Sequence, residues 1–377
     1  MKESIRRRGT TWTMQHEVSR AGKRTFLTKG GFKTKREAQA ALTESLSRHA
    51  RGEAIEPSKN TVAVYLRDWI TLVEPRVKPS THRSYSDIVA HRLVPHLGDV
   101  RLSELRPASI ARCYAELRTS GRRDGKGGLS ETSLEHTHRV LHSALEHATR
   151  SRLVARNVSN DVVKPRRGHV DMKTWSPQQL RAFLDSTRSH RLHPLFLTAG
   201  TTAMRRGEVL GLRWEDVDLE AARLSVRRNR VAVGYQVLEG TPKTRKGVRV
   251  IDLDPETVAT LRAWRRHRLE ERLAGGPTGV DSGLVFVRED GTGLHPHAVA
   301  DAFERALAHS GVPAIRFHDL RHTWASLALQ AGVSAKVVSE RLGHASISIT
   351  LDTYTHVLPA MQADTAAQVA GLIFGPQ

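Results

Sequence analysis

Apolar and polar residues follow a strand-like and then a helical pattern over the first 56 residues. Residues 12–18 alternate apolar and polar side chains, and residues 24–28 predict a second strand. After a Gly-Gly turn, Thr34 to Ala50 predicts a helix in which Thr34 is the N-cap and Glu37 completes a capping box. The pattern therefore predicts a small sheet with one helix, a unit suited to reading DNA rather than to catalysis.

Helical periodicity dominates residues 61–160. From Thr61 onward, Val64, Leu66, Trp69, Ile70 and Val73 share one apolar face. Further helices are predicted from Pro79 toward His91, from Leu102 to Leu117 with Pro107 near the start, and from Ser130 to Arg150. A linker at residues 56–60 precedes this all-helical domain, and a basic linker at 163–169 follows it.

Residues 170–377 mix both periods. Helices are predicted on each side of residue 205 and over 255–269, 296–310, 318–331 and 334–342. Strands are predicted over 224–233, 236–239 and 248–253, as one small antiparallel sheet. The whole chain is therefore predicted to be an α+β multidomain protein with domains at 1–56, 61–160 and 170–377.

The charge balance points to a polyanionic partner. The 377 residues include 59 Lys and Arg against 39 Asp and Glu, a formal net charge of +20. Lys and Arg bind nucleic acid by displacing the counterions that condense on its phosphates. The alternative from charge alone is an ordinary soluble protein of an arginine-rich proteome.

Other compositional features exclude several classes of protein. A lone cysteine, Cys113, cannot form an intrachain disulfide or a cysteine-based zinc finger and suits a reducing cytosol. The sequence contains no run of about 18 apolar residues, as a membrane span would need. The charged first eight residues lack the apolar stretch of a signal peptide. We therefore expect a cytoplasmic protein.

His318 and Arg321 are predicted to lie on one face of a helix, three positions apart. An arginine fork can hold two phosphate oxygens while a histidine moves a proton. The alternatives are a capping histidine with a surface arginine, or a zinc site formed with His322. Zinc is disfavoured because Asp319 stands where zinc proteases have glutamate and no third ligand is evident.

Two further groups carry candidate chemistry. Arg205 and Glu208 stand three apart at a helix start, so the carboxylate can steady the guanidinium and free N–H groups can face a phosphate. The basic segment Thr241 to Gly247 is predicted to be a hairpin tip whose lysine reaches into a DNA groove. A surface ion pair and a solvated turn are the simpler interpretations.

Later in the chain, Gly343 is predicted to be a helix C-cap before His344, and Tyr354 follows ten residues on.

Taken together, these residues resemble the tyrosine recombinase or phage integrase family. The local wording is close at FHDLRHTWAS (317–326), LGHAS (342–346) and TLDTYTHV (350–357). Residues 61–160 resemble the helical core-binding domain of that family, and residues 1–56 its small N-terminal domain for arm-type DNA sites. The matching positions are Arg205, Glu208, Lys243, His318, Arg321, His344 and Tyr354.

The resemblance implies a role for each of these side chains. Tyr354 attacks the scissile phosphodiester to give a 3′-phosphotyrosine, and the two arginines hold the non-bridging oxygens. Lys243 protonates the leaving 5′-oxygen, His318 assists Tyr354 and His344 hydrogen-bonds the phosphate. Glu208 orients these groups from behind. No metal or other cofactor is implied.

Some positions depart from the family pattern or leave a choice open. Ala203-Met204 replaces the usual Gly-Leu before Arg205. Lys246 competes with Lys243 for the role of general acid, whereas the Arg-x-x-Glu spacing favours Arg205 over Arg206. Candidate DNA contacts outside the catalytic set are all basic: Arg6, Arg7, Arg8, Lys33, Lys35, Arg36, Lys164, Arg166, Arg167, Arg245 and Lys246.

The expected partners follow from the same resemblance. Double-stranded attachment-type DNA is the substrate, bound by a homotetramer, with an excisionase and a host DNA-bending protein as helpers. Residues 361–377 predict a short apolar helix that docks on a neighbouring subunit or, alternatively, on its own domain. The competing functions are a type IB topoisomerase, a chromosome-dimer resolvase and a DNA-binding regulator without catalysis.

Overall fold

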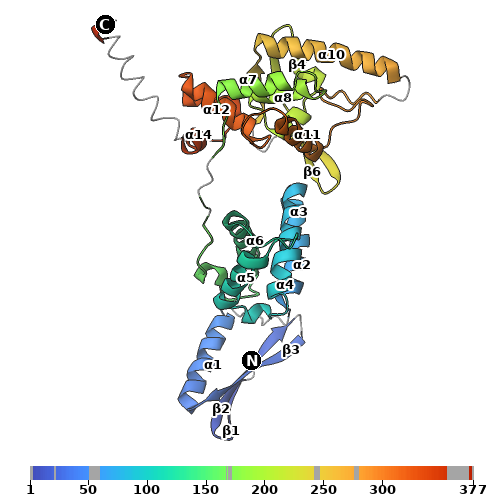
Figure 1. The fold of residues 1–377 in the computed structure, drawn as a ribbon. Helices are drawn as coiled ribbons and strands as arrows, with labels where there is room; N and C mark the ends of the chain where they lie inside the picture. Colours follow the sequence, from blue (N-terminus) through green and yellow to red (C-terminus); the bar gives the residue numbers. More distant parts are fainter. Residues whose placement is uncertain are drawn as a thin grey trace. The chain divides into compact units, whose positions relative to one another are not determined.

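The computed structural model describes residues 3–20, 23–50, 60–166, 168, 172–241, 247–275, 280–354 and 373–375. Contacts within the chain divide it into two compact units, Met1–His169 and Val170–Gln377. Helices predominate, and small antiparallel sheets occur both near the N-terminus and in the second unit (Figure 1). The predicted α+β class is confirmed.

The first unit begins with an antiparallel sheet in the order β1-β2-β3. Its strands are β1 (Glu3–Arg8), β2 (Thr11–Arg20) and β3 (Lys23–Phe32), and helix α1 (Lys35–Ala50) follows. The predicted cap is present: Thr34 Oγ1 accepts from the Glu37 amide at 3.2 Å, and the Glu37 carboxylate accepts from the Thr34 amide. The sequence did not predict β1, because this edge strand carries three consecutive arginines instead of an alternating pattern.

After α1, the described residues of the first unit form five α-helices, together with short 3-10 and π-helical segments. The α-helices are α2 (Val62–Val73), α3 (Pro79–Ile88), α4 (Val94–Leu97), α5 (Pro107–Ser120) and α6 (Glu131–Arg150). Thr61 caps α2 and Ser130 caps α6 through their side-chain oxygens. The predicted helix from Leu102 was wrong at its start, since α5 begins at Pro107. Proline has no amide to donate and therefore suits the first helical turn.

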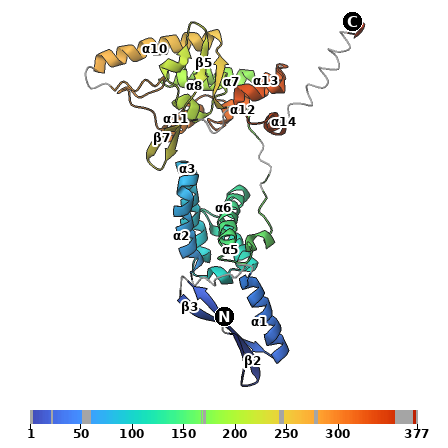
Figure 2. The same cartoon turned by 180° about the vertical axis from the view of Figure 1, so that it is seen from behind.

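The second unit places its helices around two small sheets (Figures 1 and 2). The helices are α7 (Pro177–Ser186), α8 (His193–Thr202), α9 (Arg206–Leu210), α10 (Pro255–Gly275), α11 (Pro296–Ala308), α12 (Asp319–Gln330), α13 (Ala335–Leu342) and α14 (Ile347–Tyr354). One sheet has the order β4-β5-β8, with β4 (Val217–Asp218), β5 (Arg223–Val226) and β8 (Arg249–Asp252). The other pairs β6 (Asn229–Val233) with β7 (Gln236–Gly240).

These sheets correct two expectations from the sequence. The predicted strand over 224–233 is split at residues 227–228, so the described residues form two sheets rather than one. In addition, β7 pairs with β6 and β8 pairs with β5, so the strands before and after the predicted hairpin tip belong to different sheets, while residues 242–246 themselves lie outside the described part of the chain. Apolar alternation runs through both strands and cannot reveal which neighbour each strand selects.

An aromatic cluster forms the centre of the second unit. The Phe183 ring lies 5.0 Å from Phe303, 5.1 Å from Trp175 and 5.7 Å from Phe196, measured between ring centroids. The Trp175 indole donates to the carbonyl of Pro313 at 2.8 Å, which satisfies its only polar atom. This cluster joins α7, α8 and α11 into one core.

A second, smaller cluster lies under the residues of chemical interest. It contains Ala203, Ala325, Ala328, Leu329, Val338, Leu342 and Tyr354, all buried. These side chains come from the end of α8 and from α12, α13 and α14, so the cluster fixes these helices against one another. Along the described parts of the chain, no helix has the length and apolar character needed to cross a membrane.

Removing the central phenyl ring should weaken the second unit. We predict that Phe183→Ala lowers the free energy of unfolding by about 3–5 kcal/mol, because it leaves a cavity among three aromatic rings. Tyr235→Ala, at a fully exposed position, should change it by less than about 0.5 kcal/mol. Urea unfolding of both variants measures the difference, and equal losses would show that Phe183 is not central to the core.

Candidate active site

A pocket of about 440 Å³ in the second unit brings together residues that are far apart in the sequence. Five of the predicted site residues line it: Arg205, Glu208, His318, Arg321 and His344. They come from the start of α9, the start of α12 and the turn after α13. The sequence-based grouping of these five residues is therefore reproduced by the geometry of the pocket.

Arg205 is the N-cap residue of α9 and is bound to Glu208 twice. Its backbone amide donates to Glu208 Oε2 at 3.0 Å, and its guanidinium Nη1 donates to Oε1 at 2.7 Å. The Arg205 side chain is 38% exposed, whereas that of Glu208 is 2% exposed. The carboxylate therefore holds the guanidinium from the protein side and leaves its outer edge open to a ligand.

Arg249 is the second cation bound to Glu208. Its Nη2 donates to Glu208 Oε2 at 2.9 Å, and its side chain is almost completely buried. Burial alone would raise the pKa of Glu208, but Arg249 and Arg205 outweigh it and hold that pKa below its ordinary value. Glu208 is therefore a carboxylate at neutral pH.

Arg321 is buried on the first turn of α12 and is held by main-chain oxygens. Its Nη1 donates to the Ala203 carbonyl at 2.7 Å, and its Nη2 donates to the Leu342 carbonyl. Burial, with the nearby charge of Arg205, lowers the pKa of Arg321 to about 9. A phosphate bound in the pocket would place a negative counter-charge beside this guanidinium.

Ala203 presents its carbonyl to Arg321 from a strained backbone. It ends α8 with φ 58° and ψ 22°, a left-handed conformation that favours glycine. Ala203 stands where the family that the sequence resembles usually has glycine. The structure gives that position a physical meaning, because the turn aims a carbonyl at a buried cation.

Two of the three histidines that line the pocket, His344 and His318, are neutral at physiological pH. Burial, together with Arg321 and Arg205, lowers the pKa of His344 to about 4, and its Nδ1 shares a 2.8 Å hydrogen bond with Thr350 Oγ1. His318 keeps access to solvent at the pocket mouth. The pKa of His318 is nevertheless lowered, because protein atoms displace part of its hydration and His322 and Arg321 add positive charge.

Tyr354 lies beside the pocket but is not among its described lining residues. Its side chain is 1% exposed, and its hydroxyl shares a 2.8 Å hydrogen bond with His322 Nδ1. Burial raises the pKa of Tyr354 to about 12, although Arg321 acts in the opposite direction. The sequence-based prediction paired the tyrosine with His318, whereas the hydrogen bond runs to His322, one helical turn further along α12.

Sequence reasoning missed three residues around the site. His322 was considered only as half of a zinc-like pair. Arg249 carries no local signal, because its partner Glu208 is 41 positions away. Asn229 lines the pocket and lies so close to Gly207 that a Cβ there would come within 2.0 Å of the Asn229 Oδ1. Gly207, which lies directly before Glu208, is the local signal for such a close approach, but it does not reveal which neighbour approaches.

Several predicted residues lie outside the described part of the chain. They are Lys243, Arg245 and Lys246 of the segment 242–246, Arg167 of the basic linker, and nearly all of the predicted C-terminal helix. In the ranges that the structure does describe, no group of three or more His, Cys, Asp or Glu side chains is arranged to hold a metal ion.

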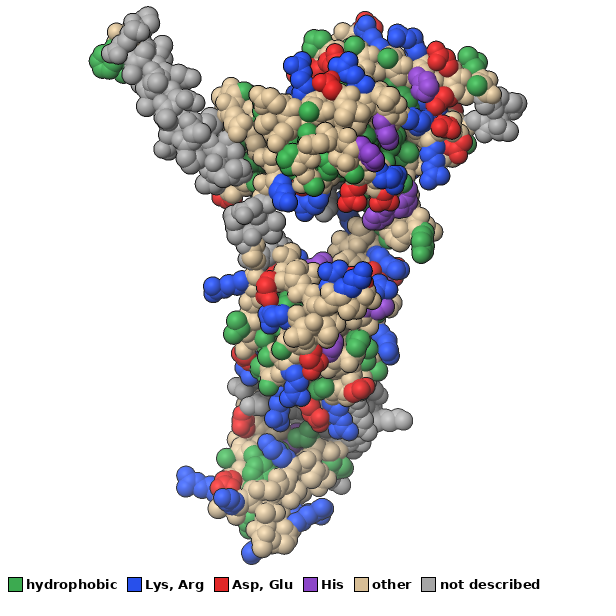
Figure 3. All heavy atoms as spheres, viewed as in Figure 1, with side chains coloured by type: hydrophobic (Ala, Val, Ile, Leu, Met, Phe, Trp, Pro, Cys, Tyr) green, Lys and Arg blue, Asp and Glu red, His purple; other side chains and the backbone are tan. Residues whose placement is uncertain are grey.

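The remaining candidate DNA contacts are exposed. Arg6, Arg7 and Arg8 lie on β1, Lys33, Lys35 and Arg36 lie at the start of α1, and Lys164 and Arg166 lie after α6. Lys and Arg side chains are spread over the visible face of both units (Figure 3). This distribution fits contact with a long polyanion better than one local basic patch.

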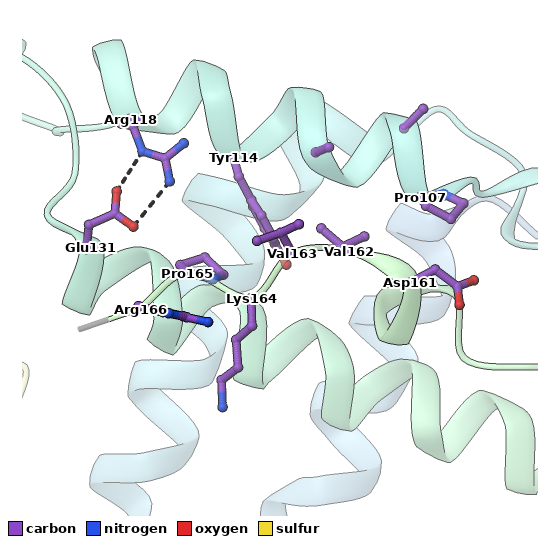
Figure 4. A pocket seen from close by; sticks show the side chains of 12 residues that line it. Pro107, Tyr114, Arg118, Glu131, Asp161, Val162, Val163, Lys164, Pro165 and Arg166 are labelled. Carbon is purple, nitrogen blue, oxygen red and sulfur yellow. Dashed lines mark hydrogen bonds and ion pairs between the residues drawn. The ribbon is translucent and has the colours of Figure 1, made fainter. Parts of the chain in front are cut away.

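Lys164 and Arg166 also border a pocket of about 610 Å³ in the first unit (Figure 4). Residues 161–166 run past α5 there, and Arg118 pairs with Glu131 through two hydrogen bonds of 2.6 and 3.2 Å at its edge. Lys164 lies 3.9 Å from a Glu135 carboxylate oxygen. These acidic neighbours make this pocket a poorer anion site than the one around Arg321.

The lowered pKa of His344 predicts a pH-dependent contribution to stability. A histidine that binds protons less well when folded stabilises the protein above pH 6.5, and the contribution disappears as the pH falls toward 4. His344→Asn can keep the bond to Thr350 but does not titrate. The stability of the wild type relative to His344→Asn should therefore decrease between pH 6.5 and 4 in thermal unfolding. A difference that does not change with pH would contradict the shift.

Similarity to known proteins extends over most of the chain. The model of the phage integrase family matches residues 173–361, that of an arm DNA-binding domain matches 4–48, and that of the integrase N-terminal SAM-like domain matches 61–118. A tyrosine recombinase XerC-like protein of Caldanaerobacter subterraneus subsp. tengcongensis is 28% identical over 352 residues, which is 88% of each chain.

Solved structures share the fold. The Tn1549 transposon integrase in complex with a circular intermediate DNA has a TM-score of 0.67 and 19% identity, covering 81% of this chain and 99% of that one. A lambda integrase tetramer bound to a Holliday junction has a TM-score of 0.59 and 18% identity, covering 91% and 95%. Since the family model matches half of the sequence and its pattern of arginines and histidines converges in one pocket, the chain belongs to the phage integrase family of tyrosine-type site-specific recombinases.

Proposed function

We propose that this integrase cuts and rejoins DNA at specific sites through a covalent 3′-phosphotyrosine on Tyr354. The observation that carries the proposal is the convergence of Arg205, Arg321, His318 and His344 in one pocket beside that tyrosine. Two guanidiniums and two neutral histidines suit a phosphodiester, which is anionic and needs both charge neutralisation and proton transfer.

The reaction is a pair of phosphoryl transfers. The Tyr354 hydroxyl oxygen forms a bond to phosphorus while the bond from phosphorus to the 5′-oxygen breaks, and that oxygen leaves with a proton from Lys243. A 5′-hydroxyl of the partner strand then attacks the phosphotyrosine and releases the tyrosine. The phosphodiester bond energy stays in the intermediate, so rejoining needs no ATP.

The arginines stabilise the charge that builds on the non-bridging oxygens. Arg321 is fixed by two carbonyls and Arg205 by Glu208, so both are oriented before the DNA arrives. Preorganised donors cost no reorganisation in the transition state, which is why such groups contribute strongly to catalysis. His344 donates a hydrogen bond to the same phosphate.

Tyr354 has to leave its resting position before it can attack. Its hydroxyl is buried, bound to His322 and held protonated by a pKa of about 12. The hydrogen bond to His322, which itself lines the pocket, holds the nucleophile in this buried position, and His318 accepts the tyrosine proton once the tyrosine has moved to the phosphate. Cleavage then depends on a rearrangement of α14 when DNA binds.

The rest of the chain holds the DNA. Residues 1–56 bind arm-type sites and residues 61–160 bind the core site, while 170–377 carry the chemistry. Four copies act together, with the segment 361–377 of one copy docked on the next. An excisionase and a host DNA-bending protein select the direction of the reaction, and the protein acts in the cytoplasm on the nucleoid.

Trapping the covalent intermediate tests the proposal. Nicked, labelled DNA from the region flanking the protein's own gene should yield an adduct at one defined site after denaturation, because the nick lets the short fragment with the free 5′-hydroxyl escape before it can reverse the reaction. Tyr354→Phe should bind the same DNA and form no adduct. Specific binding with no adduct from the wild type would favour a regulator, and relaxation of any supercoiled plasmid without a defined site would favour a topoisomerase.

Arg321→Lys should show whether the positive charge at residue 321 is sufficient or whether the forked shape of the guanidinium is also needed. Lysine keeps a positive charge but cannot bind the Ala203 and Leu342 carbonyls together with a phosphate. We expect the cleavage rate to fall about 100- to 1000-fold while the affinity for the site changes little. Single-turnover cleavage and gel-shift titration measure the two quantities, and wild-type cleavage by this variant would contradict the role of the fork.

A further inference from the structure

Arg249 makes three directional contacts from one buried side chain at the start of β8. Its Nη2 donates to Glu208 Oε2 at 2.9 Å, its Nη1 to the Gly247 carbonyl at 3.0 Å and its Nε to the Arg341 carbonyl at 2.6 Å. The side chain is 7% exposed, so it is too deeply placed to meet DNA directly. Its effect on the pocket has to pass through its partners.

One set of contacts leads from Arg249 to Arg205. Both guanidiniums share the Glu208 carboxylate, with Arg205 on Oε1 and Arg249 on Oε2. A carboxylate bound at both oxygens cannot rotate without losing a charge-assisted hydrogen bond. Arg249 therefore fixes the plane of the carboxylate that orients Arg205.

A second set of contacts leads from Arg249 to Arg321. The carbonyls at the end of a helix have no partner within the helix. At the end of α13, the Arg341 carbonyl accepts from Arg249, the Leu342 carbonyl from Arg321, and the Gly343 carbonyl from Arg205 at 3.4 Å. Three consecutive carbonyls thus each hold one arginine, and the position of the first constrains the next two.

We propose that Arg249 is a positioning residue for the recombination reaction, which aligns both phosphate-binding arginines through Glu208 and the end of α13. This inference rests on the proposed function. Arg249 does not touch the substrate. Its removal slows cleavage because Arg205 and Arg321 are then misplaced and neutralise the charged phosphate less well.

Substrate charge distinguishes this role from general support of the fold. A methylphosphonate at the scissile position replaces one charged oxygen with a methyl group, so correctly placed arginines matter less. Once adduct trapping has mapped the site, single-turnover cleavage is measured on phosphate and methylphosphonate DNA with the full chain and the variants Arg249→Met and Arg249→Lys. Arg191→Met is the matched control, since Arg191 also binds a carboxylate, Glu271, and a carbonyl, Val287, but neither of these partners lines the pocket, whereas Glu208 does.

We expect Arg249→Met to cleave phosphate DNA about 100-fold more slowly than the wild type, since small misplacements of catalytic groups have effects of this order. On methylphosphonate DNA the two should agree within about threefold. Arg249→Lys should remain impaired because it cannot make three divergent contacts. The cleavage rate of Arg191→Met relative to the wild type should be the same on both substrates. Thermal unfolding and DNA affinity identify folded variants, and Arg249→Lys serves if Arg249→Met does not fold.

Three results would overturn the inference. These are equal losses on both substrates, no loss on phosphate DNA, or full activity of Arg249→Lys. Each of these results counts against the inference only when the wild type forms the Tyr354 adduct. A wild type that forms no adduct would instead overturn the proposed function, so the two failures can be told apart.

Discussion

Three consecutive main-chain carbonyls at the end of α13 organise the candidate active site. Each accepts a hydrogen bond from a different arginine: Arg341 from Arg249, Leu342 from Arg321 and Gly343 from Arg205. The negative end of the helix dipole adds to the attraction. Gly343 makes the arrangement possible because it turns the chain at φ 65°, in the left-handed region. Arginines from β8, α12 and the start of α9 thereby meet in one place with a single buried carboxylate among them.

In the proposed reaction, this arrangement prepares the arginines but not the nucleophile. Arg321 and Arg205 are already fixed by hydrogen bonds within the protein, whereas Tyr354 is buried with its hydroxyl on His322. Burial and the neighbouring charge of Arg205 lower the pKa of Arg321, so its positive charge is unfavourable on its own. A bound phosphate would offset part of this cost. If Tyr354 is released only in the assembled complex, a recombination site that has not been brought together with its partner site is not cleaved.

The sequence predicted those features that depend on neighbours close along the chain. The capping pairs Thr34–Glu37 and Arg205–Glu208 and the C-cap at Gly343 are local, and each is present. The pocket itself was predictable only because five residues match a family pattern. By contrast, β1, the split of the strand over 224–233 and the bond from Tyr354 to His322 depend on long-range packing. No spacing rule connects Arg249 with the carbonyl of Arg341, 92 positions later.

The identity of the nucleophile tests the account most directly. Trypsin cleavage after Arg341 gives a fragment that begins at Leu342 and contains one tyrosine, Tyr354, and no further Lys or Arg up to Gln377. Mass spectrometry of the trapped adduct should find the DNA on Tyr354 of this fragment, joined through its 3′-phosphate, and the released strand should carry a free 5′-hydroxyl. DNA attached to any other residue, or through its 5′ end, would contradict the mechanism.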